Sequence, residues 1–220
     1  MRHLVIGNGE IGSAIAEVLE ADVIDKDEQA DCENYEFIHI CFPYNPDFIE
    51  QVEDYQKEYQ PSFTIIHSTV PVGVSKIVNA VHSPVRGRHP NLEPSIRTFV
   101  KFFGGKGADI CAREFEDLGI ETITTPNSED TEAMKLWDTT IYGINIILQK
   151  KIHKYCEENG LDFNVVYTKA NETYNMGYAE MGEPQFCKYV LETNEGPIGG
   201  HCVVPNLPLL DEKWVDKFFN

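Results

Sequence analysis

The sequence predicts an α/β fold in which a doubly wound parallel sheet is followed by a long helix and a small helical domain. Apolar runs of strand length alternate with helical patterns, and three closely spaced glycines join the first run to the first helical pattern. A single helical pattern then extends from residue 128 to residue 159. The predicted domains are residues 1–126, which form the sheet, and residues 127–220, which form the long helix and the helical domain.

Composition limits the possible functions. The chain has 220 residues, 42% of them hydrophobic, and a net charge of −18. It can therefore bury a substantial core, and its negative charge argues against nucleic acid or an anionic membrane as a partner. No run is long and apolar enough to span a bilayer, and the chain opens directly in a strand, so a cytoplasmic location is expected. The six cysteines lack C-x-x-C spacing and are expected to be mostly buried, reduced thiols.

The first strand, turn and helix centre on residues 4–12. Their three glycines have the G-x-G-x-x-G spacing of a Rossmann-like dinucleotide site. The first glycine permits a sharp turn, the second lets a pyrophosphate approach the backbone, and the third lets the helix pack on the strand. A glycine-rich turn without a ligand is the alternative. The predicted cofactor contacts in this stretch are Gly7, Asn8, Gly9, Glu10, Ile11 and Gly12.

The second apolar run ends in Asp25, about 20 residues beyond the first glycine, where an acid would bond a ribose 2′-hydroxyl. A carboxylate there would repel a 2′-phosphate, which favours NAD as the cofactor. The alternative is an ordinary surface acid.

Further strands and helices alternate along the chain, which is typical of a parallel, doubly wound sheet. An acidic linker at residues 26–33 comes first, expected to be a loop or a short exposed helix. Pro43, which stops the next strand, is another predicted cofactor contact. The expected strands are 36–42, 63–67, 99–105 and 121–124, and the expected helices are 48–59, 74–81 and 110–118.

Residues 83–94 concentrate proline and positive charge in an acidic protein. This loop is predicted to meet an anion, with Arg86, Arg88 and His89 as candidate substrate contacts. The alternative is a rigid loop whose arginines pair with surface acids.

The long helix begins near Ser128, which is the expected N-cap because acids fill the following turn. Its nearly continuous apolar face could form the spine between two domains or two subunits. A smaller helical segment is expected at residues 163–191.

Four motifs resemble the UDP-glucose and GDP-mannose dehydrogenase family, which oxidises nucleotide sugars twice to uronic acids. They are the glycine fingerprint, the S-T-V-P-V-G turn at 68–73, the T-E-A-M-K-L segment at 131–136 and the G-P-I-G-G-H-C segment at 196–202. The resemblance covers most of the chain and implies NAD as the cofactor.

The resemblance also implies roles for four residues. Cys202 would be the nucleophile that attacks a sugar aldehyde, and Lys135 would stabilise a developing alkoxide or oxyanion. Ser68 and Thr69 would lie beside the nicotinamide, with Thr69 positioning the ring or the catalytic water. The alternatives are a buried structural thiol and a surface lysine paired with Glu132 or Asp138. The histidines near Cys202 show no metal-ligand spacing, so no metal is expected.

The chain departs from the family at positions that matter for the chemistry. Val85 replaces a glutamate, Thr139 replaces an asparagine and Asn206 replaces an aspartate that helps activate water. The sequence ends at Asn220, whereas relatives continue into a domain that grips the nucleotide. Full nucleotide-sugar oxidation is therefore not expected unless another chain supplies that domain.

Three functions stay open. The first is an NAD-dependent oxidoreductase with this core that acts on a small-molecule substrate, either a sugar nucleotide or a different or smaller molecule. The second resembles the β-hydroxyacid dehydrogenases, in which Lys135 works and Cys202 is incidental. The third is a catalytically inactive nucleotide-binding or regulatory protein. A homodimer is expected through the long helix, with Ile141, Ile144 and Leu148 as candidate contacts.

Overall fold

The structure is a computed structural model that describes residues 2–26, 28–30, 34–192, 203–210, 212 and 215. The chain divides into two compact units, Met1–Leu136 and Trp137–Asn220. The division falls within the long helix α6 (Ser128–Asn159).

The first unit is built on a seven-stranded sheet with strand order β2-β1-β3-β4-β5-β6-β7. Every neighbouring pair is parallel except β5 and β6, which are antiparallel. The chain leaves β1 for β2 and then returns to β3 on the other side, so the topological switch point lies between β1 and β3. The strands are β1 (His3–Ile6), β2 (Asp22–Ile24), β3 (Phe37–Ile40), β4 (Phe63–Ile66), β5 (Val81–His82), β6 (Lys101–Gly104) and β7 (Thr122–Thr125).

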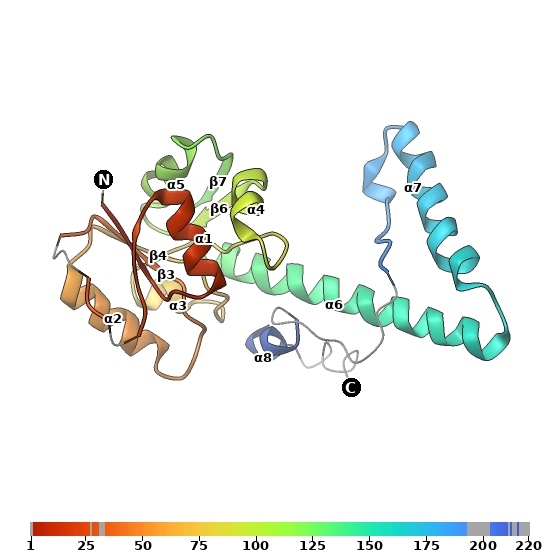
Figure 1. Cartoon of the computed structure of the whole chain (residues 1–220), viewed down its shortest axis with the longest axis horizontal. Coiled ribbons are helices and arrows are strands. Elements are labelled where there is room, and N and C mark those ends of the chain that lie inside the picture. The colour runs from red at the N-terminus through yellow and green to blue at the C-terminus, as the bar shows by residue number, and fades with distance from the viewer. Residues whose placement is uncertain are drawn as a thin grey trace. The chain divides into compact units, whose positions relative to one another are not determined.

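Helices cover both faces of this sheet, and Figure 1 shows α1, α4 and α5 above the strands with α2 and α3 below them. The expected helix at residues 48–59 is confirmed, because Phe48 and Val52 face the core one helical turn apart. The five helices are α1 (Glu10–Leu19), α2 (Phe48–Tyr59), α3 (Val74–Ile77), α4 (Leu92–Thr98) and α5 (Ala108–Glu116).

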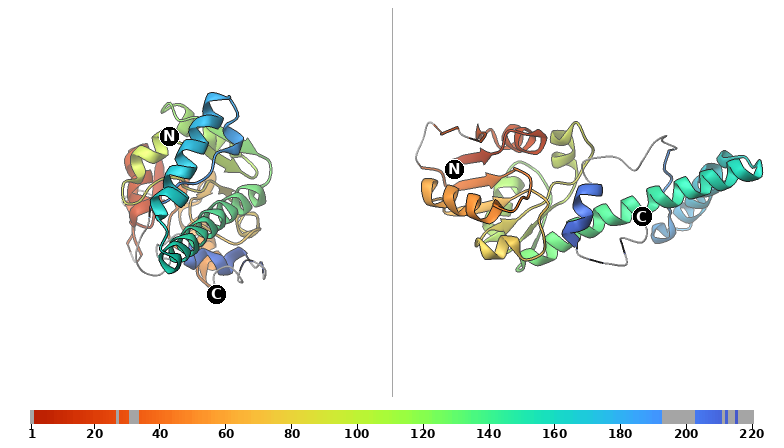
Figure 2. Two further views of the ribbon diagram at one scale, coloured as in Figure 1. Left: turned by 90° about the vertical axis from the view of Figure 1, so that its right-hand side faces the viewer. Right: turned by 90° about the horizontal axis from the view of Figure 1, so that it is seen from below.

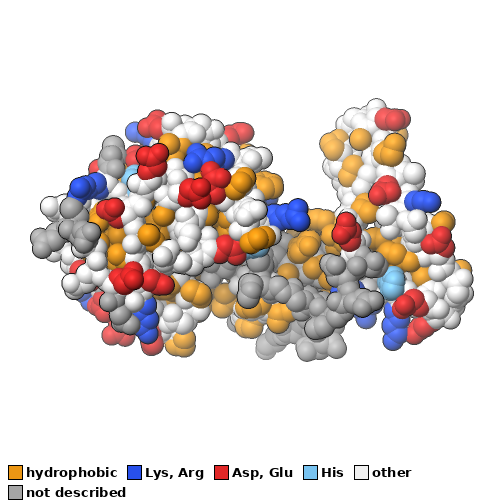
Figure 3. All heavy atoms as spheres, viewed as in Figure 1, with side chains coloured by type: hydrophobic (Ala, Val, Ile, Leu, Met, Phe, Trp, Pro, Cys, Tyr) orange, Lys and Arg blue, Asp and Glu red, His pale blue; other side chains and the backbone are white. Residues whose placement is uncertain are grey.

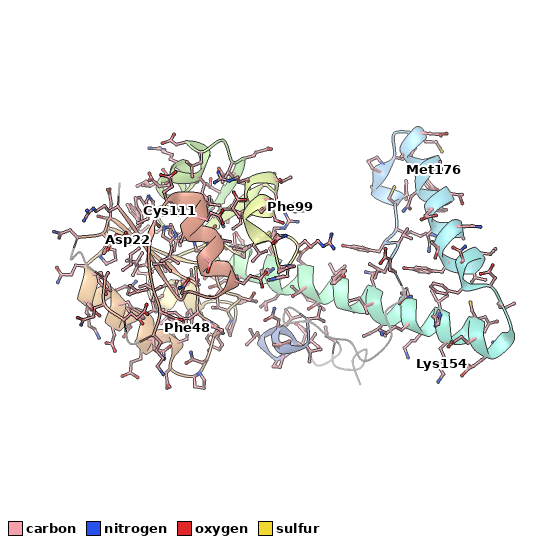
Figure 4. The ribbon with its side chains drawn as sticks, viewed as in Figure 1. Asp22, Phe48, Phe99, Cys111, Lys154 and Met176 are labelled. Atoms are coloured by element: carbon pink, nitrogen blue, oxygen red, sulfur yellow. The ribbon has the colours of Figure 1, made fainter. Side chains whose placement is uncertain are left out.

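Successive side chains of a strand point to opposite faces of the sheet, so the core is divided into two layers. Val5, Phe37 and Ile65 pack under α1, α4 and α5, whereas Leu4, Ile38 and Ile66 pack against α2 and α3. Figure 4 labels one residue from each layer, Cys111 of α5 and Phe48 of α2.

The second unit contains most of α6, a 32-residue helix that Figure 2 shows as one unbroken element. A π-helix (Asn164–Lys169) and α7 (Ala170–Glu180) follow, and then 3-10 turns at Pro184–Phe186 and Val204–Asn206 and the short helix α8 (Leu207–Leu210). Aromatic contacts tie the small helices together. The Phe163 ring stacks on the Tyr167 ring with 5.1 Å between the ring centres. The ring centres of Tyr178 and Phe186 lie 5.0 Å apart.

Four expectations need correction. The helix expected at 74–81 ends at Ile77, because Val81 and His82 pair with β4 as a short strand. The loop expected through residue 94 already contains the start of α4, which buries Leu92 and Ile96. The sheet is not wholly parallel, since β6 runs against β5. Ser128 is the first helical residue rather than the cap, a shift of one position.

Within the described residues, no helix combines the length and the hydropathy needed to cross a membrane. The expected cytoplasmic location stays a prediction.

Candidate cofactor site

The predicted cofactor residues gather at one edge of the sheet. The turn 7–12 follows β1, Asp25 follows β2, Pro43 comes shortly after β3, and Ser68 comes shortly after β4. Because these four strands are parallel, their carboxyl ends share this edge. In open α/β sheets, ligands bind outside the carboxyl ends of the strands at the switch point.

Each of the three positions in the turn has a different structural reason for being glycine. Gly7 has a φ of +103°, which favours glycine, and its N–H donates to the Ile24 carbonyl at 2.8 Å. A Cβ on Gly12 would lie 1.8 Å from the Gly7 oxygen, so helix and turn can pack this closely only without a side chain. Gly9 has an ordinary φ of −79°, and its Cβ would meet nothing within 4 Å. Packing therefore explains two of the glycines and leaves an open surface above the third.

Helix α1 begins directly beyond this open surface, with Gly9 as its N-cap. The first N–H groups of a helix have no intrahelical acceptor, and the helix dipole adds positive potential there. The Asn8 side chain is held aside by the Ser13 hydroxyl at 3.1 Å. Ile11 is half-buried and packs against the core beneath α1. The turn thus presents backbone donors suited to an anion.

The other edge residues differ in exposure. Asp25 is exposed, and its carboxylate accepts the Lys26 N–H at 2.9 Å. Pro43 is exposed and Thr69 is half-buried, whereas Ser68 is buried and donates to the Phe42 carbonyl at 2.6 Å. Ser68 therefore fixes the end of β4 against the segment that follows β3.

The first turns of α6 are anchored to the same edge by buried polar contacts. The Glu132 carboxylate accepts the backbone N–H groups of Gly73 at 2.6 Å and Ser75 at 2.8 Å. The His82 ring lies 2.9 Å from the Thr131 hydroxyl and 3.2 Å from the Ser68 carbonyl. Burial lowers the pKa of His82 to about 3, so its ring is neutral at neutral pH. These contacts place Lys135, one turn further along, beside the edge.

The half-buried Lys135 donates from Nζ to the Val85 carbonyl at 2.9 Å. Its neighbour Glu132 binds the backbone N–H groups of Gly73 and Ser75. The alternative role of Lys135, pairing with Glu132 or Asp138, stays a prediction. The Val85 side chain is 6% exposed and belongs to the core. At this position, where the family has a glutamate, the chain therefore has a buried apolar side chain.

The basic loop after β5 lies against α1. His89 pairs with the Glu10 carboxylate at 2.7 Å, and the Arg86 guanidinium lies 5.7 Å from the centre of the Phe102 ring. Arg88 is exposed, and its backbone N–H donates to Ser95. The loop therefore meets the N-terminus of α1, which is the predicted pyrophosphate site.

The remaining predicted catalytic residues lie outside the described part of the sheet unit. Cys202 and the glycines before it lie outside the described residues. Thr139 is buried in α6, and Asn206 ends a 3-10 turn in the second unit. Cys41 follows β3, but burial raises its pKa to about 12, which keeps it a thiol.

A set of buried polar residues lies beneath this edge and has no counterpart among the predicted site residues, namely His3, His39, His67, His82 and Lys101. A signal was present, since the expected strand 36–42 contains His39 and the expected strand 63–67 ends in His67.

The parallel sheet, the glycine turn and the switch-point edge define a dehydrogenase-like Rossmann fold. Comparison with solved structures agrees. The UDP-D-ManNAc dehydrogenase from Pyrococcus horikoshii matches all of this chain with a TM-score of 0.72 at 16% identity, over 68% of its own length. The UDP-N-acetyl-mannosamine dehydrogenase from Staphylococcus aureus matches with a TM-score of 0.64 at 17% identity, also over 68% of its length.

A conserved protein of unknown function, described as similar to 3-hydroxyacid dehydrogenases, matches 84% of the chain with a TM-score of 0.62 at 11% identity. The nucleotide-sugar dehydrogenase resemblance inferred from the motifs is confirmed at the level of the fold, and at these identities the likeness goes no further. No protein-family model and no curated protein sequence matches the chain.

Proposed function

We propose that the chain is an NAD-dependent dehydrogenase whose cofactor lies across the carboxyl edge of β1–β4. The observation that supports this most strongly is the turn after β1. Backbone geometry requires glycine at position 7, and packing requires it at position 12. Neither backbone geometry nor packing requires glycine at position 9. An approaching pyrophosphate supplies the missing reason.

The residues present fit a dinucleotide. The N–H groups at the start of α1 would hold the pyrophosphate, and the exposed Asp25 carboxylate would accept hydrogen bonds from the adenosine ribose. Ser68 and Thr69 lie after β4, where the nicotinamide end of an extended dinucleotide would reach. The nicotinamide, when bound, accepts a hydride from an alcohol substrate.

Lys135 is the described residue best suited to act on such a substrate. It is half-buried, and its Nζ is fixed by the Val85 carbonyl. A fixed ammonium in a partly dry site would stabilise an alkoxide oxygen. Arg86, Arg88 and His89 would then contact the anionic part of the substrate or the cofactor.

Cofactor binding is tested by calorimetric titration of NAD and NADP into the full chain. Gly9→Val adds a Cβ that meets no protein atom within 4 Å, and its side chain would block the pyrophosphate. We therefore expect a loss of NAD affinity of about 100-fold or more without unfolding. Gly177→Val is the control, because Gly177 also faces open space and has no positive φ. Equal affinity in both variants would refute the proposed site, and tighter binding of NADP than NAD would refute the role of Asp25.

The reaction is tested by NADH production on sugar nucleotides and on small hydroxy acids. Loss of turnover in both Lys135→Met and Cys202→Ser, with NAD binding retained, supports the two-residue chemistry of the nucleotide-sugar dehydrogenases. Loss in Lys135→Met alone supports the hydroxyacid dehydrogenase type. NAD binding without turnover on any substrate would overturn the enzymatic proposal and leave the nucleotide-binding protein.

A homodimer through α6 is the second part of the proposal. Ile141 and Leu148 are 46% and 53% exposed on this helix, and Ile144 between them is half-buried. Figure 3 shows hydrophobic side chains at the surface of the α6 and α7 segments. Leu148→Glu should produce monomers in light scattering. Leu118→Glu, a change at a similarly exposed leucine of the sheet unit, should leave the mass unchanged. A wild-type monomer at high concentration would refute this part.

A further inference from the structure

Four buried ionisable side chains form a diagonal line across the face of the sheet that α5 covers. They are His3 on β1, His39 on β3, His67 just after β4 and Lys101 at the start of β6, and none is more than 9% exposed. His3 Nδ1 lies 3.0 Å from His39 Nε2, and His39 Nδ1 lies 2.9 Å from His67 Nε2. The register explains the line. His3 pairs with Phe37, and His39 lies two residues beyond Phe37; His39 in turn pairs with Ile65, and His67 lies two residues beyond Ile65.

Each end of this line has a defined partner. At one end His3 Nε2 lies 3.1 Å from a carboxylate oxygen of Glu114, on α5. At the other end His67 Nδ1 lies 2.7 Å from the Ser83 carbonyl oxygen. Lys101 Nζ is 3.3 Å from the same oxygen and 3.4 Å from His67 Nδ1. The ring nitrogens therefore bond to one another, and the described residues hold no group of three or more side chains that could bind a metal.

The acceptors at the two ends fix the protons in between. A carbonyl oxygen only accepts, so His67 Nδ1 must carry a proton, and its Nε2 must accept from His39. The same logic makes His39 accept from His3 Nδ1. His3 Nε2 then faces a carboxyl group, so His3 and Glu114 together must hold one further proton. Lys101 can be the neutral amine in this arrangement.

We propose that His3, His39, His67 and Lys101 form a proton relay through the sheet, and that its two tautomeric arrangements control the position of the Ser83 carbonyl. In the transfer, the His3 Nδ1 proton passes to His39 Nε2 as the His39 Nδ1 proton passes to His67 Nε2. The His67 Nδ1 proton passes to Lys101 Nζ. One positive charge leaves the His3–Glu114 pair and appears on Lys101, and no other atom is gained or lost.

The transfer changes the contact at Ser83. His67 Nδ1 becomes an acceptor, and two acceptors 2.7 Å apart repel, so the carbonyl must turn toward the new Lys101 ammonium. The segment that carries this carbonyl also carries the Val85 carbonyl bound by Lys135. The relay is therefore coupled mechanically to the lysine at the cofactor edge, whether or not a cofactor is bound.

The surroundings keep the two central rings of the relay neutral and lower the pKa of the groups at both ends. Burial lowers the pKa of His39 and His67 well below the usual value, so both rings are neutral. Burial lowers the pKa of Lys101 to about 7, helped by Lys135 and opposed by Cys41. Burial also lowers the pKa of His3, which Glu114 and Glu36 oppose. His82, on β5, also lowers the pKa of His67.

Raising the pH takes the extra proton of the His3–Glu114 pair into solvent instead of onto Lys101. Each ring again changes from its Nδ1–H to its Nε2–H form, and an N–H of the neutral Lys101 amine then donates to His67 Nδ1. The test is nitrogen NMR of the imidazole rings in the full chain from about pH 5.5 to about pH 9. We expect His39 and His67 to change tautomer together, and the Ser83 and Val85 carbonyl carbon shifts to follow with the same midpoint.

Two variants make the test specific. Lys101→Met removes the only described side chain that donates to Ser83 or His67 in the high-pH form, so the rings should stay Nδ1–H throughout. Lys106→Met, at an exposed lysine just after β6, should behave like the wild type. In His39→Leu, the His67 ring should no longer change tautomer when His3 titrates. Rings that keep one tautomer in the wild type, that titrate with separate midpoints, or that switch normally in Lys101→Met would each overturn the relay.

Discussion

The two faces of the central sheet are packed by different rules. The face under α2 and α3 is aliphatic, with Leu4, Ile38, Ile40 and Ile66 almost wholly buried. The face under α1, α4 and α5 buries the histidine line and Lys101 among apolar neighbours that include Phe37, Phe103 and Phe115. Both faces are buried, but the line of four ionisable side chains lies on one of them. On the other face His82, which alternates with Val81 along β5, is the buried histidine.

This difference separates stability from response. Aliphatic burial contributes free energy that does not depend on pH. Buried imidazoles and a buried amine resist ionisation in the folded state only, so they make folding stability depend on pH. The aliphatic face is therefore expected to supply stability, and the polar face to carry whatever the fold does in response to protons.

Ile38→Ala should give the largest effect, because Ile38 is fully buried in a central strand of the aliphatic face. Loss of its side chain and the resulting cavity should lower the free energy of unfolding by about 4 kcal/mol. Urea unfolding at several pH values should show the same loss at each. A loss that varied with pH would mean that the two faces are coupled.

Lys101→Met should have the opposite sign and raise stability by about 2 kcal/mol at neutral pH. The pKa of Lys101 falls from 10.5 to about 7 on folding, so the unfolded chain binds its proton more tightly. The resulting penalty is complete below pH 7 and disappears as the pH rises toward 10.5. Urea unfolding should therefore show a gain that shrinks on the alkaline side. A destabilised variant at pH 7 would show that the amine is a net structural support.

His39→Leu should reduce the loss of stability in acid. Because burial holds the pKa of His39 well below 6.5, only the unfolded chain gains this proton as the pH falls. Removing the ring should make the acid slope of unfolding free energy shallower by about 1.4 kcal/mol per pH unit. Thermal or urea unfolding of both proteins below pH 6 gives the two slopes. Parallel slopes would mean that His39 is protonated in the folded state.

The sequence predicted those parts of the fold that local patterns encode. Helix α2 follows from its apolar spacing, and the turn after β1 follows from three glycines. Strand β5 has only two residues, which is too short to show a period, and its antiparallel neighbour depends on the path of residues 83–100. Helix α4 was missed because a proline-rich segment with two buried residues resembles a loop.

The site divides in the same way. The glycines, Asp25 and Lys135 are marked by spacing and by resemblance to a family. The histidine line depends on register between strands far apart in sequence, and a slip of one residue would move a histidine to the opposite face. From the sequence, Glu132 is expected only as an alternative partner for Lys135. No local pattern indicates that the backbone N–H groups of Gly73 and Ser75 bind its carboxylate.

Thr64→Val is the smallest expected change and the sharpest test of the comparison between the faces. Thr64 is a buried polar residue on the aliphatic side, where its hydroxyl accepts from the Gln56 amide at 3.0 Å. The same amide nitrogen also donates to the Val78 carbonyl at 2.9 Å, so it keeps one partner when the hydroxyl is lost. Stability should therefore fall by only about 1 kcal/mol in urea unfolding, equally at acid and neutral pH, because neither partner ionises. If the stability change at this neutral pair depended on pH as strongly as that at His39, the difference between the two faces would come from burial itself and not from ionisable groups.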